Sequence, residues 1–217
     1  MNDLYRTCLR KGTNMTTGLQ TGTDGIIRCS WPGRHVDYTA YHDYEWGYPV
    51  DDDRSLFEKI CLEGFQAGLS WLTILRKRDH LRKAFADFDP AIVIRFERRE
   101  IEKLLEDSTI IRHQGKIEST INNAARCLEL MEEFGSLATY IWSWEPSQTT
   151  RVSSDSLPTF TPTSAALSRD LKARGWSFVG PTTIYAFMQA VGLVNDHLSG
   201  CFAHPKVEVS RKNLIRP

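Results

Sequence analysis

The 217-residue sequence lacks net charge, long apolar runs and an apolar N-terminal signal. Its 27 lysine and arginine residues balance 27 aspartate and glutamate residues, so any contact with nucleic acid must come from local patches rather than from bulk charge. No apolar run is long enough to cross a bilayer, and the N-terminal residues do not have the apolar core of a secretory signal. We therefore expect a cytoplasmic protein with no membrane partner.

Cysteine is also scarce, with five residues in the chain. An odd number of cysteines in a chain that we expect to be cytoplasmic argues against a disulfide framework and leaves metal binding or plain burial. Cys61 and Cys127 fall within apolar helical patterns, and we interpret both as small core residues, because free cysteine is among the most buried residue types.

Strand-like alternation of apolar and polar residues is missing beyond a few positions, which predicts an all-α fold. Apolar residues instead recur at helical spacing, as in the segments 56–61, 101–105 and 117–128. Asp89 followed by Pro90 predicts a helix start, because an acidic N-cap and a proline in the first turn both favour helix initiation.

Composition sets the expected domain boundaries. Residues 1–25 are rich in threonine, glycine and asparagine, so we expect a disordered N-terminal extension. The folded domain is predicted over residues 26–205, followed by a flexible C-terminal tail over 206–217. Residues 145–163 contain three prolines and many serines and threonines, which predicts one long connection. Nothing indicates an obligate protein partner, and we expect a monomer.

Two pairs of metal-ligand residue types stand at opposite ends of the predicted domain: Cys29 with His42, and His197 with Cys201. The second pair is four residues apart, which places both side chains on one face of a helical turn. Two thiolates and two imidazoles complete a tetrahedral zinc shell without an open position, as in structural zinc sites. Since cysteine and histidine are also common buried residues, the spacing alone leaves simple burial as an alternative.

Longer motifs surround these residues and the segments between them. They are Cys-Ser-Trp at 29–31, Tyr-His-Asp-Tyr-Glu-Trp-Gly at 41–47, Leu-Glu-Gly-Phe-Gln-Ala-Gly-Leu-Ser-Trp at 62–71, Ile-Ile-Arg-His-Gln-Gly-Lys at 110–116, Phe-Met-Gln-Ala at 187–190 and Gly-Leu-Val-Asn-Asp-His at 192–197. In this order, they resemble the bacterial 3-methyladenine DNA glycosylase I family from about residue 28 to about residue 201.

This resemblance implies a helix-hairpin-helix DNA glycosylase fold in which one structural zinc joins the N- and C-terminal ends of the domain. The implied zinc ligands are Cys29, His42, His197 and Cys201. The implied activity is flipping of a 3-methyladenine nucleotide out of double-stranded DNA, followed by hydrolysis of the N-glycosidic bond. The expected partner is therefore double-stranded DNA that contains alkylated purines, and the reaction would initiate base excision repair.

The resemblance also implies a base pocket. Glu63 stands in an apolar stretch, where a carboxylate is either a solvated turn residue or a buried acid, and it matches the base-recognising glutamate of the family. We expect Glu63 to be the catalytic-site acid, with Trp71, Tyr41 and Tyr38 as pocket aromatics and Gln66 as a pocket wall. Aromatic faces and a buried carboxylate suit a base made cationic by methylation.

Contact with the DNA backbone is expected from a hairpin over residues 108–116, through Ile110, Arg112, Gly115 and Lys116. Backbone N–H groups at the start of a helix hold phosphate without reading sequence. Thr109 occupies a position where the family often has glycine, so the first turn of this hairpin is expected to differ.

The group that activates water remains open among Glu63, Asp43 and Asp196. No lysine lies in the signature region to form a Schiff base, so strand cleavage is not expected. One alternative function is a non-catalytic, zinc-stabilised module that binds alkylated DNA. A second is a zinc hydrolase, although such an enzyme needs an open metal position that the proposed four-ligand shell does not leave.

Overall fold

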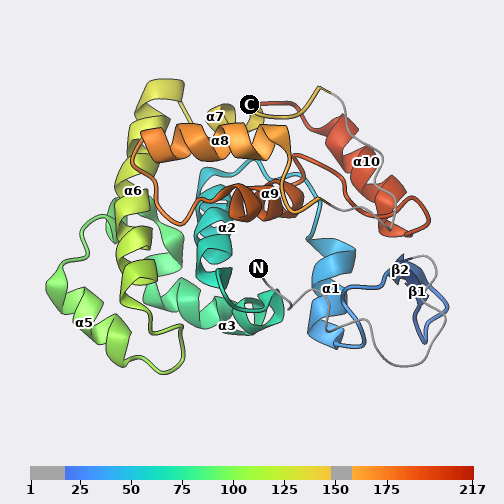
Figure 1. The fold of residues 1–217 in the computed structure, drawn as a ribbon, viewed down its shortest axis with the longest axis horizontal. Helices are drawn as coiled ribbons and strands as arrows, with labels where there is room; N and C mark the ends of the chain where they lie inside the picture. Colours follow the sequence, from blue (N-terminus) through green and yellow to red (C-terminus); the bar gives the residue numbers. More distant parts are fainter. Residues whose placement is uncertain (1–17, 148–157) are drawn as a thin grey trace.

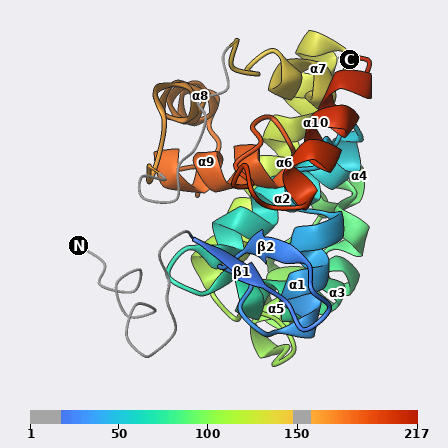
Figure 2. The ribbon, with the colours of Figure 1, turned by 90° about the vertical axis from the view of Figure 1, so that its right-hand side faces the viewer.

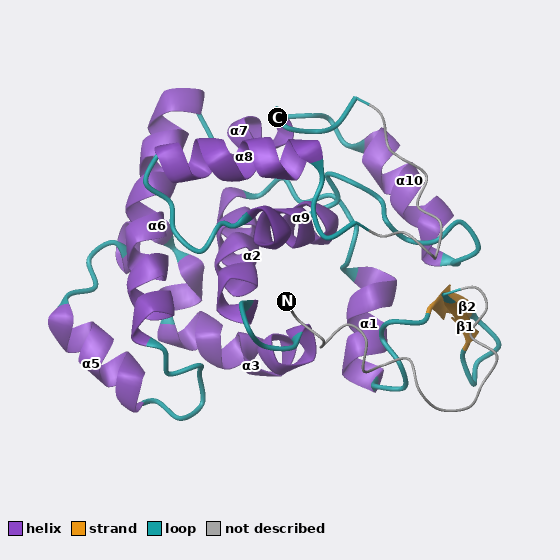
Figure 3. Ribbon diagram, in the orientation of Figure 1, coloured by secondary structure: helices purple, strands orange, loops and turns teal. Residues whose placement is uncertain are grey.

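The computed structural model describes residues 18–147 and 158–217, and this part of the chain is predominantly helical (Figures 1 and 3). Its helices are α1 (Val36–Tyr44), α2 (Asp53–Gln66), α3 (Trp71–Ala84), the short turn η3 (Ala86–Phe88), α4 (Pro90–Val93), α5 (Arg98–Glu106), α6 (Gln114–Phe134), α7 (Leu137–Trp142), α8 (Pro162–Ala173), α9 (Pro181–Ala190) and α10 (Ala203–Asn213). No helix in the described ranges is long and apolar enough to span a bilayer.

Two short strands depart from the all-α prediction. Strand β1 (Leu19–Thr21) pairs antiparallel with β2 (Ile27–Cys29). Leu19 packs on the small apolar cluster that contains Cys29, so the expected disordered extension is wrong for residues 18–25. The rest of that extension, residues 1–17, lies outside the described residues, as does the segment 148–157 of the predicted connection.

Local sequence signals account for several helix boundaries. The Asp89 side chain accepts a hydrogen bond from the first turn of α4, with Pro90 in that turn, as predicted. Ser70 caps α3 by accepting a bond from the backbone N–H of Thr73. Between α2 and α3, Gly68 has a φ of +80°, a conformation that favours glycine and turns the chain sharply.

Helix α2 is central to the described fold. It contacts α3, α6, α7 and α9, and α9 in turn packs along α8 (Figure 1). In Figure 2, α7–α10 lie in the upper part of the molecule and α1, α3 and α5 in the lower part. Most residues of α2 from Leu56 to Phe65 are buried, including the polar residues Lys59 and Glu63. The principal core therefore surrounds the helix that carries the predicted catalytic acid.

Helix α10 shows that the prediction of a flexible tail over residues 206–217 is wrong for most of its length. Val207 and Arg211 are buried within this helix. The Arg211 guanidinium donates hydrogen bonds to the Leu193 carbonyl and to the Glu145 carboxylate, both at 3.0 Å. These bonds fasten the C-terminal segment to the body of the protein, which composition alone did not indicate.

The loop between α9 and α10 brings the C-terminal part of the chain back to the N-terminal part. Gly192 has a φ of +76°, and a Cβ there would lie 2.6 Å from the Gly47 carbonyl, so only glycine fits this approach. His197 and Cys201 lie in this irregular loop, and the predicted helical turn for the pair is therefore wrong. A backbone bond from Cys201 to Leu198 forms a tight turn instead.

Candidate functional site

Glu63 places a carboxyl group inside the protein near the end of α2. The residue is 5% exposed, and among the described residues its Oε2 atom has no hydrogen-bond partner. Burial raises the pKa of Glu63 to about 8, and the neighbouring charge of Lys59 offsets only part of this effect. At neutral pH this group is therefore mainly the neutral acid.

Two cations near this part of α2 are bound to a different carboxylate, Glu45. Lys59, one helical turn before Glu63, donates to Glu45 Oε1 at 2.7 Å. Arg78 donates to both oxygens of Glu45, at 2.6 and 2.8 Å. Burial alone would raise the pKa of Glu45, but the two cations outweigh it and lower that pKa to about 2. Glu45 is thus fully paired, whereas Glu63 makes no ion pair or hydrogen bond with the residues that the structure describes.

Aromatic side chains adjoin Glu63. The Tyr41 and Trp71 rings lie 5.4 Å apart between centroids, and Tyr38 stacks on Tyr41 at 6.4 Å. Burial raises the pKa of Tyr41, and the charge of Glu63 raises it further. The buried Trp71 Nε1 also has no hydrogen-bond partner within the described ranges. An unpaired acid and an unpaired indole N–H beside aromatic faces suit a planar ligand with polar edges.

Gln66, predicted as a pocket wall, is the last residue of α2 and is half-buried. It begins the exposed link over residues 67–70, in which the Leu69 N–H donates to the Gln66 carbonyl at 2.7 Å. Its position follows Glu63 by one turn of α2, so the backbone places it near the acid, while the role of its side chain stays a prediction.

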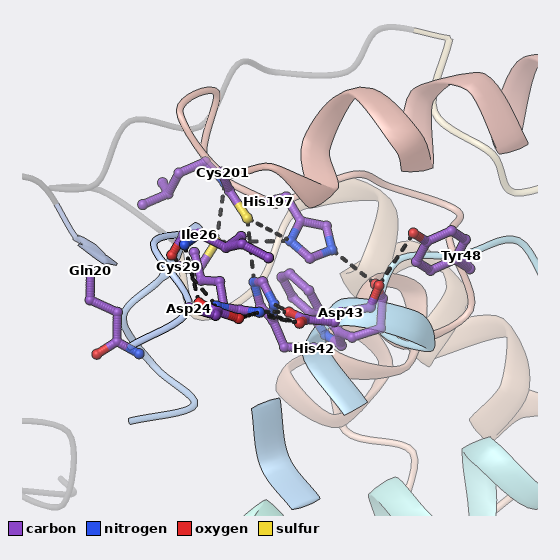
Figure 4. A network of polar contacts seen from close by, with 12 residues as sticks. Gln20, Asp24, Ile26, Cys29, His42, Asp43, Tyr48, His197 and Cys201 are labelled. Atoms are coloured by element: carbon purple, nitrogen blue, oxygen red, sulfur yellow. Dashed lines mark hydrogen bonds and ion pairs between the residues drawn. The ribbon is translucent and has the colours of Figure 1, made fainter. Parts of the chain in front are cut away.

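The four predicted metal ligands come together between the two ends of the described fold (Figure 4). Cys29, His42, His197 and Cys201 are all buried, and their ligand atoms lie within 4.8 Å of one another. The His42 Nε2 atom is 3.5 Å from Cys201 Sγ, and His197 Nδ1 is 3.7 Å from Cys201 Sγ and 3.9 Å from Cys29 Sγ. This cluster could hold a metal ion.

The second nitrogen of each imidazole is held away from the cluster. His42 Nδ1 lies 2.7 Å from the Asp43 carboxylate, and His197 Nε2 lies 2.9 Å from the Trp46 carbonyl. Arg28 donates to both oxygens of Asp43 and so fixes that carboxylate in turn. Such partners orient the free nitrogen toward a metal and are characteristic of histidine ligands.

Trp31 connects the cluster with the aromatic pocket. Its ring lies 5.2 Å from His42, 5.1 Å from Trp46 and 4.8 Å from Tyr38, measured between centroids. On α1, the adjacent residues Tyr41 and His42 belong to the pocket and to the cluster, respectively. A displacement of the cluster would therefore displace the pocket rings.

The predicted DNA-contact residues divide into buried and exposed groups. Ile110 has a buried side chain, and its backbone N–H donates to the Asp107 carbonyl at 3.4 Å. Lys116 is also buried, so the prediction that its ammonium contacts DNA is wrong. Arg112 is exposed, and Gly115 lies half-buried in the first turn of α6. Only these last two remain at an accessible surface.

Thr109 has a negative φ, so the first turn of the hairpin does not use the left-handed conformation that a glycine allows; we expected this because threonine disfavours positive φ. Its N–H and hydroxyl donate to Asp107 Oδ1 at 2.8 and 2.6 Å, and these bonds lower the pKa of Asp107. Lys77 of α3 donates to the Ser108 and Thr109 carbonyls at 3.3 and 2.7 Å. The hairpin is thus held by its own Asp107 side chain and by Lys77 from α3.

Comparison with known proteins agrees with this geometry. A family model described as methyladenine glycosylase matches residues 31–204. The chain belongs to the methyladenine glycosylase family.

Individual members of the family are similar over most of their length. DNA-3-methyladenine glycosylase 1 of Escherichia coli is 46% identical over 181 residues, which cover 82% of this chain and 97% of the relative. The Haemophilus influenzae DNA-3-methyladenine glycosylase is 45% identical over 177 residues, covering 80% and 96%. A crystal structure of 3-methyladenine DNA glycosylase I superposes with a TM-score of 0.78 at 50% identity, covering 82% of this chain and all of that one.

A Staphylococcus aureus structure, solved for 3-methyladenine recognition, also has a TM-score of 0.78, at 34% identity, and covers 82% of this chain and 96% of that one.

The residues that sequence reasoning missed act through contacts with residues distant in sequence. Lys59 lies four residues before Glu63, a spacing typical of a helical ion pair, yet it pairs with Glu45 instead. Lys116 carried a basic signal but is buried.

The raised pKa of Glu63 predicts a pH-dependent stability penalty. An unfolded glutamate ionises near pH 4.5, and the folded one near 8. Between these values the unfolded chain has lost a proton that the folded chain retains, so the free energy of unfolding falls as pH rises and levels off above about pH 8. The free energy of unfolding falls by a few kcal/mol over this range, because each unit of pKa difference corresponds to about 1.4 kcal/mol.

We therefore expect the melting temperature of Glu63→Gln to exceed that of the wild type by a margin that grows as the pH increases from 5 to 8. Thermal denaturation at matched pH measures this margin, and any pH dependence of metal binding is common to both proteins. The exposed Glu132→Gln on α6 is the control and should show a constant margin. A margin for Glu63→Gln that does not change with pH would contradict the assignment.

Proposed function

We propose that this protein excises 3-methyladenine from double-stranded DNA by hydrolysing the N-glycosidic bond and so initiates base excision repair. The observation that carries the proposal is the buried Glu63 carboxyl near Tyr41, whose ring contacts Trp71; the Oε2 atom of Glu63 has no hydrogen-bond partner among the described residues. Family membership supports the same activity, and a structural relative at 34% identity was solved in complex with 3-methyladenine. The enzyme class is that of a hydrolytic DNA glycosylase.

The pocket distinguishes a cationic base from a neutral one. Adenine methylated at N3 in DNA carries a positive charge, which aromatic faces attract by roughly 0.5–2 kcal/mol each. The same charge supplies the cation that Glu63 lacks, because Lys59 is bound to Glu45. Binding of the cationic base therefore favours ionised Glu63, whereas unmodified adenine leaves a neutral acid and gains less.

In the flipped nucleotide, the methylated base needs little general-acid assistance to leave. A positively charged base departs as a neutral molecule, and the sugar passes through a transition state that resembles an oxocarbenium ion, as in glycoside hydrolysis. An ionised Glu63 stabilises positive charge in this region. Strand cleavage would need a free amine, but Lys59 donates to Glu45 and Lys116 to backbone carbonyls. The proposed enzyme is therefore monofunctional.

The two other candidate acids have different partners. Asp43 lies between His42 and Arg28 in the Cys/His cluster network. The Asp196 carboxylate accepts bonds from the Tyr185 hydroxyl at 2.6 Å and from the Gln189 amide at 2.8 Å. Neither is the unpaired acid of the aromatic pocket, and Glu63 is the acid that we assign to the reaction.

The duplex would be held by the hairpin before α6, with Arg112 as a charge and the N–H groups around Gly115 as donors at a helix N-terminus. Helices α8 and α9, which pack on each other and are joined by residues 174–180, offer a second place where a helix-loop-helix could contact the backbone. Contacts of this kind bind the phosphate backbone without reading sequence. We propose that the protein acts on DNA as a monomer.

The activity is tested by chromatography of the bases released from methylated duplex DNA. We expect free 3-methyladenine from the wild type and at least about a hundredfold slower release from Glu63→Gln, since a pocket group that acts at the reacting base is removed. Glu132→Gln, exposed on α6, should release base at the wild-type rate.

The same experiment separates the alternative function, a module that binds alkylated DNA without cutting it. A folded, metal-loaded wild-type protein that binds methylated duplex but releases no base would refute the glycosylase and favour the module. Equal release by wild type and Glu63→Gln would instead refute the assigned role of Glu63.

We further propose that the Cys/His cluster holds one structural zinc ion. Ligand atoms around a tetrahedral zinc, with Zn–S near 2.3 Å and Zn–N near 2.0 Å, lie about 3.5 Å apart. The distances of 3.5–3.9 Å between sulfur and nitrogen in the cluster fit that arrangement. The thiol of Cys29 and the two imidazoles lower the pKa of Cys201, which favours the thiolate that binds metal. Bound zinc would join β2 and α1 to the loop before α10.

Metal analysis tests this site. We expect one zinc per chain, lost in Cys201→Ala together with a large drop in melting temperature, because structural zinc contributes on the order of 10 kcal/mol in small domains. Cys61→Ala, which changes a buried cysteine outside the cluster, should keep its zinc. A folded Cys201→Ala protein that loses base release at unchanged stability would contradict a structural ion and favour a zinc hydrolase.

A further inference from the structure

Lys116 is a buried cation that the proposed chemistry does not use. It lies in the first turn of α6 and is 6% exposed. Its ammonium donates to the Phe65 carbonyl at 2.8 Å and to the Ala67 carbonyl at 2.6 Å. Phe65 belongs to the last turn of α2, and Ala67 begins the link that leads to Trp71 at the start of α3.

These contacts have a clear physical cause. The last carbonyls of a helix have no partner within the helix, and a cation at that end also interacts favourably with the helix dipole. Burial lowers the pKa of Lys116, so the bonds to the two carbonyls must offset the loss of hydration. The two bonds that compensate for this lost hydration fix the path of the backbone at Phe65 and Ala67.

The turn that Lys116 holds joins the two halves of the base pocket. Glu63 lies just before Phe65 on α2, and Trp71 begins α3 after the sharp bend at Gly68. The residues of the link, 67–70, are exposed, so packing does little to hold it. The bonds from Lys116 therefore restrain the path of this turn in addition to the packing of α3 on α2.

We infer that Lys116 is a positioning residue for the base pocket, which fixes the α2–α3 turn so that Glu63 and Trp71 face the same base. The inference rests on the proposed glycosylase function. It also connects the hairpin before α6, a proposed DNA contact, with the pocket through a single side chain.

Lys116→Met and Lys77→Met are a matched pair, since each removes an ammonium that donates to two backbone carbonyls. Three quantities are measured: the affinity for free 3-methyladenine, the single-turnover rate of base release, and the salt dependence of binding to undamaged duplex. Lys116→Met should weaken free-base binding and slow release by about tenfold or more through misplacement of the pocket groups. Its affinity for undamaged duplex and the salt slope should not change.

Lys77→Met should bind free base as the wild type does, because its carbonyl partners lie in the hairpin rather than at the pocket. Lys116→Arg, which keeps the charge and the donors, should recover part of the loss. If Lys116→Met does not fold, Lys116→Gln, which retains N–H donors, is expected to show a smaller loss of free-base affinity in the same direction.

Two results would overturn the inference. Unchanged free-base affinity with a shallower salt slope would make Lys116 a phosphate contact. Unchanged free-base affinity with only a lower melting temperature would make its role purely structural. A wild-type protein that neither binds nor releases 3-methyladenine would refute the proposed glycosylase function itself. Failure of the Lys116 inference can therefore be distinguished from failure of the proposed function.

Discussion

A carboxyl group buried without a cation is destabilising whenever it ionises, and Glu63 is such a group because Lys59 and Arg78 are both held by Glu45. Lys59 lies one helical turn from Glu63 but donates to Glu45. The commitment of both cations to Glu45 leaves an acceptor for charge inside an aromatic pocket, and a cationic base satisfies it. In the proposed mechanism, preference for alkylated over unmodified adenine then follows from the missing countercharge of Glu63.

The surrounding fold keeps this unfavourable arrangement in place. Tyr41 and His42 are neighbours on α1, so the pocket ring and a cluster ligand move together, and Trp31 packs between the two sites. The cluster itself joins segments from opposite ends of the described chain. The zinc ion that we propose for this cluster would therefore act on the reaction indirectly, through the position of α1.

Sequence reasoning predicted the features that depend on nearby residues. The helix start at Asp89 and Pro90 follows from local backbone preferences. The Cys/His cluster was predicted from motif resemblance, and the structure brings its four residues together, although through an irregular loop rather than a helical turn.

Features that depend on tertiary contacts were not predicted. Arg211 fastens α10 through Leu193 and Glu145, so a polar C-terminal segment that resembled a tail is ordered. Lys116 follows a basic hairpin motif, yet its partners are carbonyls about fifty positions earlier in the chain. A charged residue on a helix gives no indication, within its own segment, of which distant backbone groups need a donor.

The central claim, that Glu63 is left without a countercharge, is tested most directly by NMR titration of the glutamate side-chain carboxyl carbons in the ligand-free protein. The Glu63→Gln spectrum identifies the signal. We predict a midpoint near pH 8 for Glu63, whereas Glu45 should titrate near pH 2, or remain ionised throughout the accessible range. A midpoint near 4.5 for Glu63 would show that the carboxyl is solvated or paired and would contradict the account.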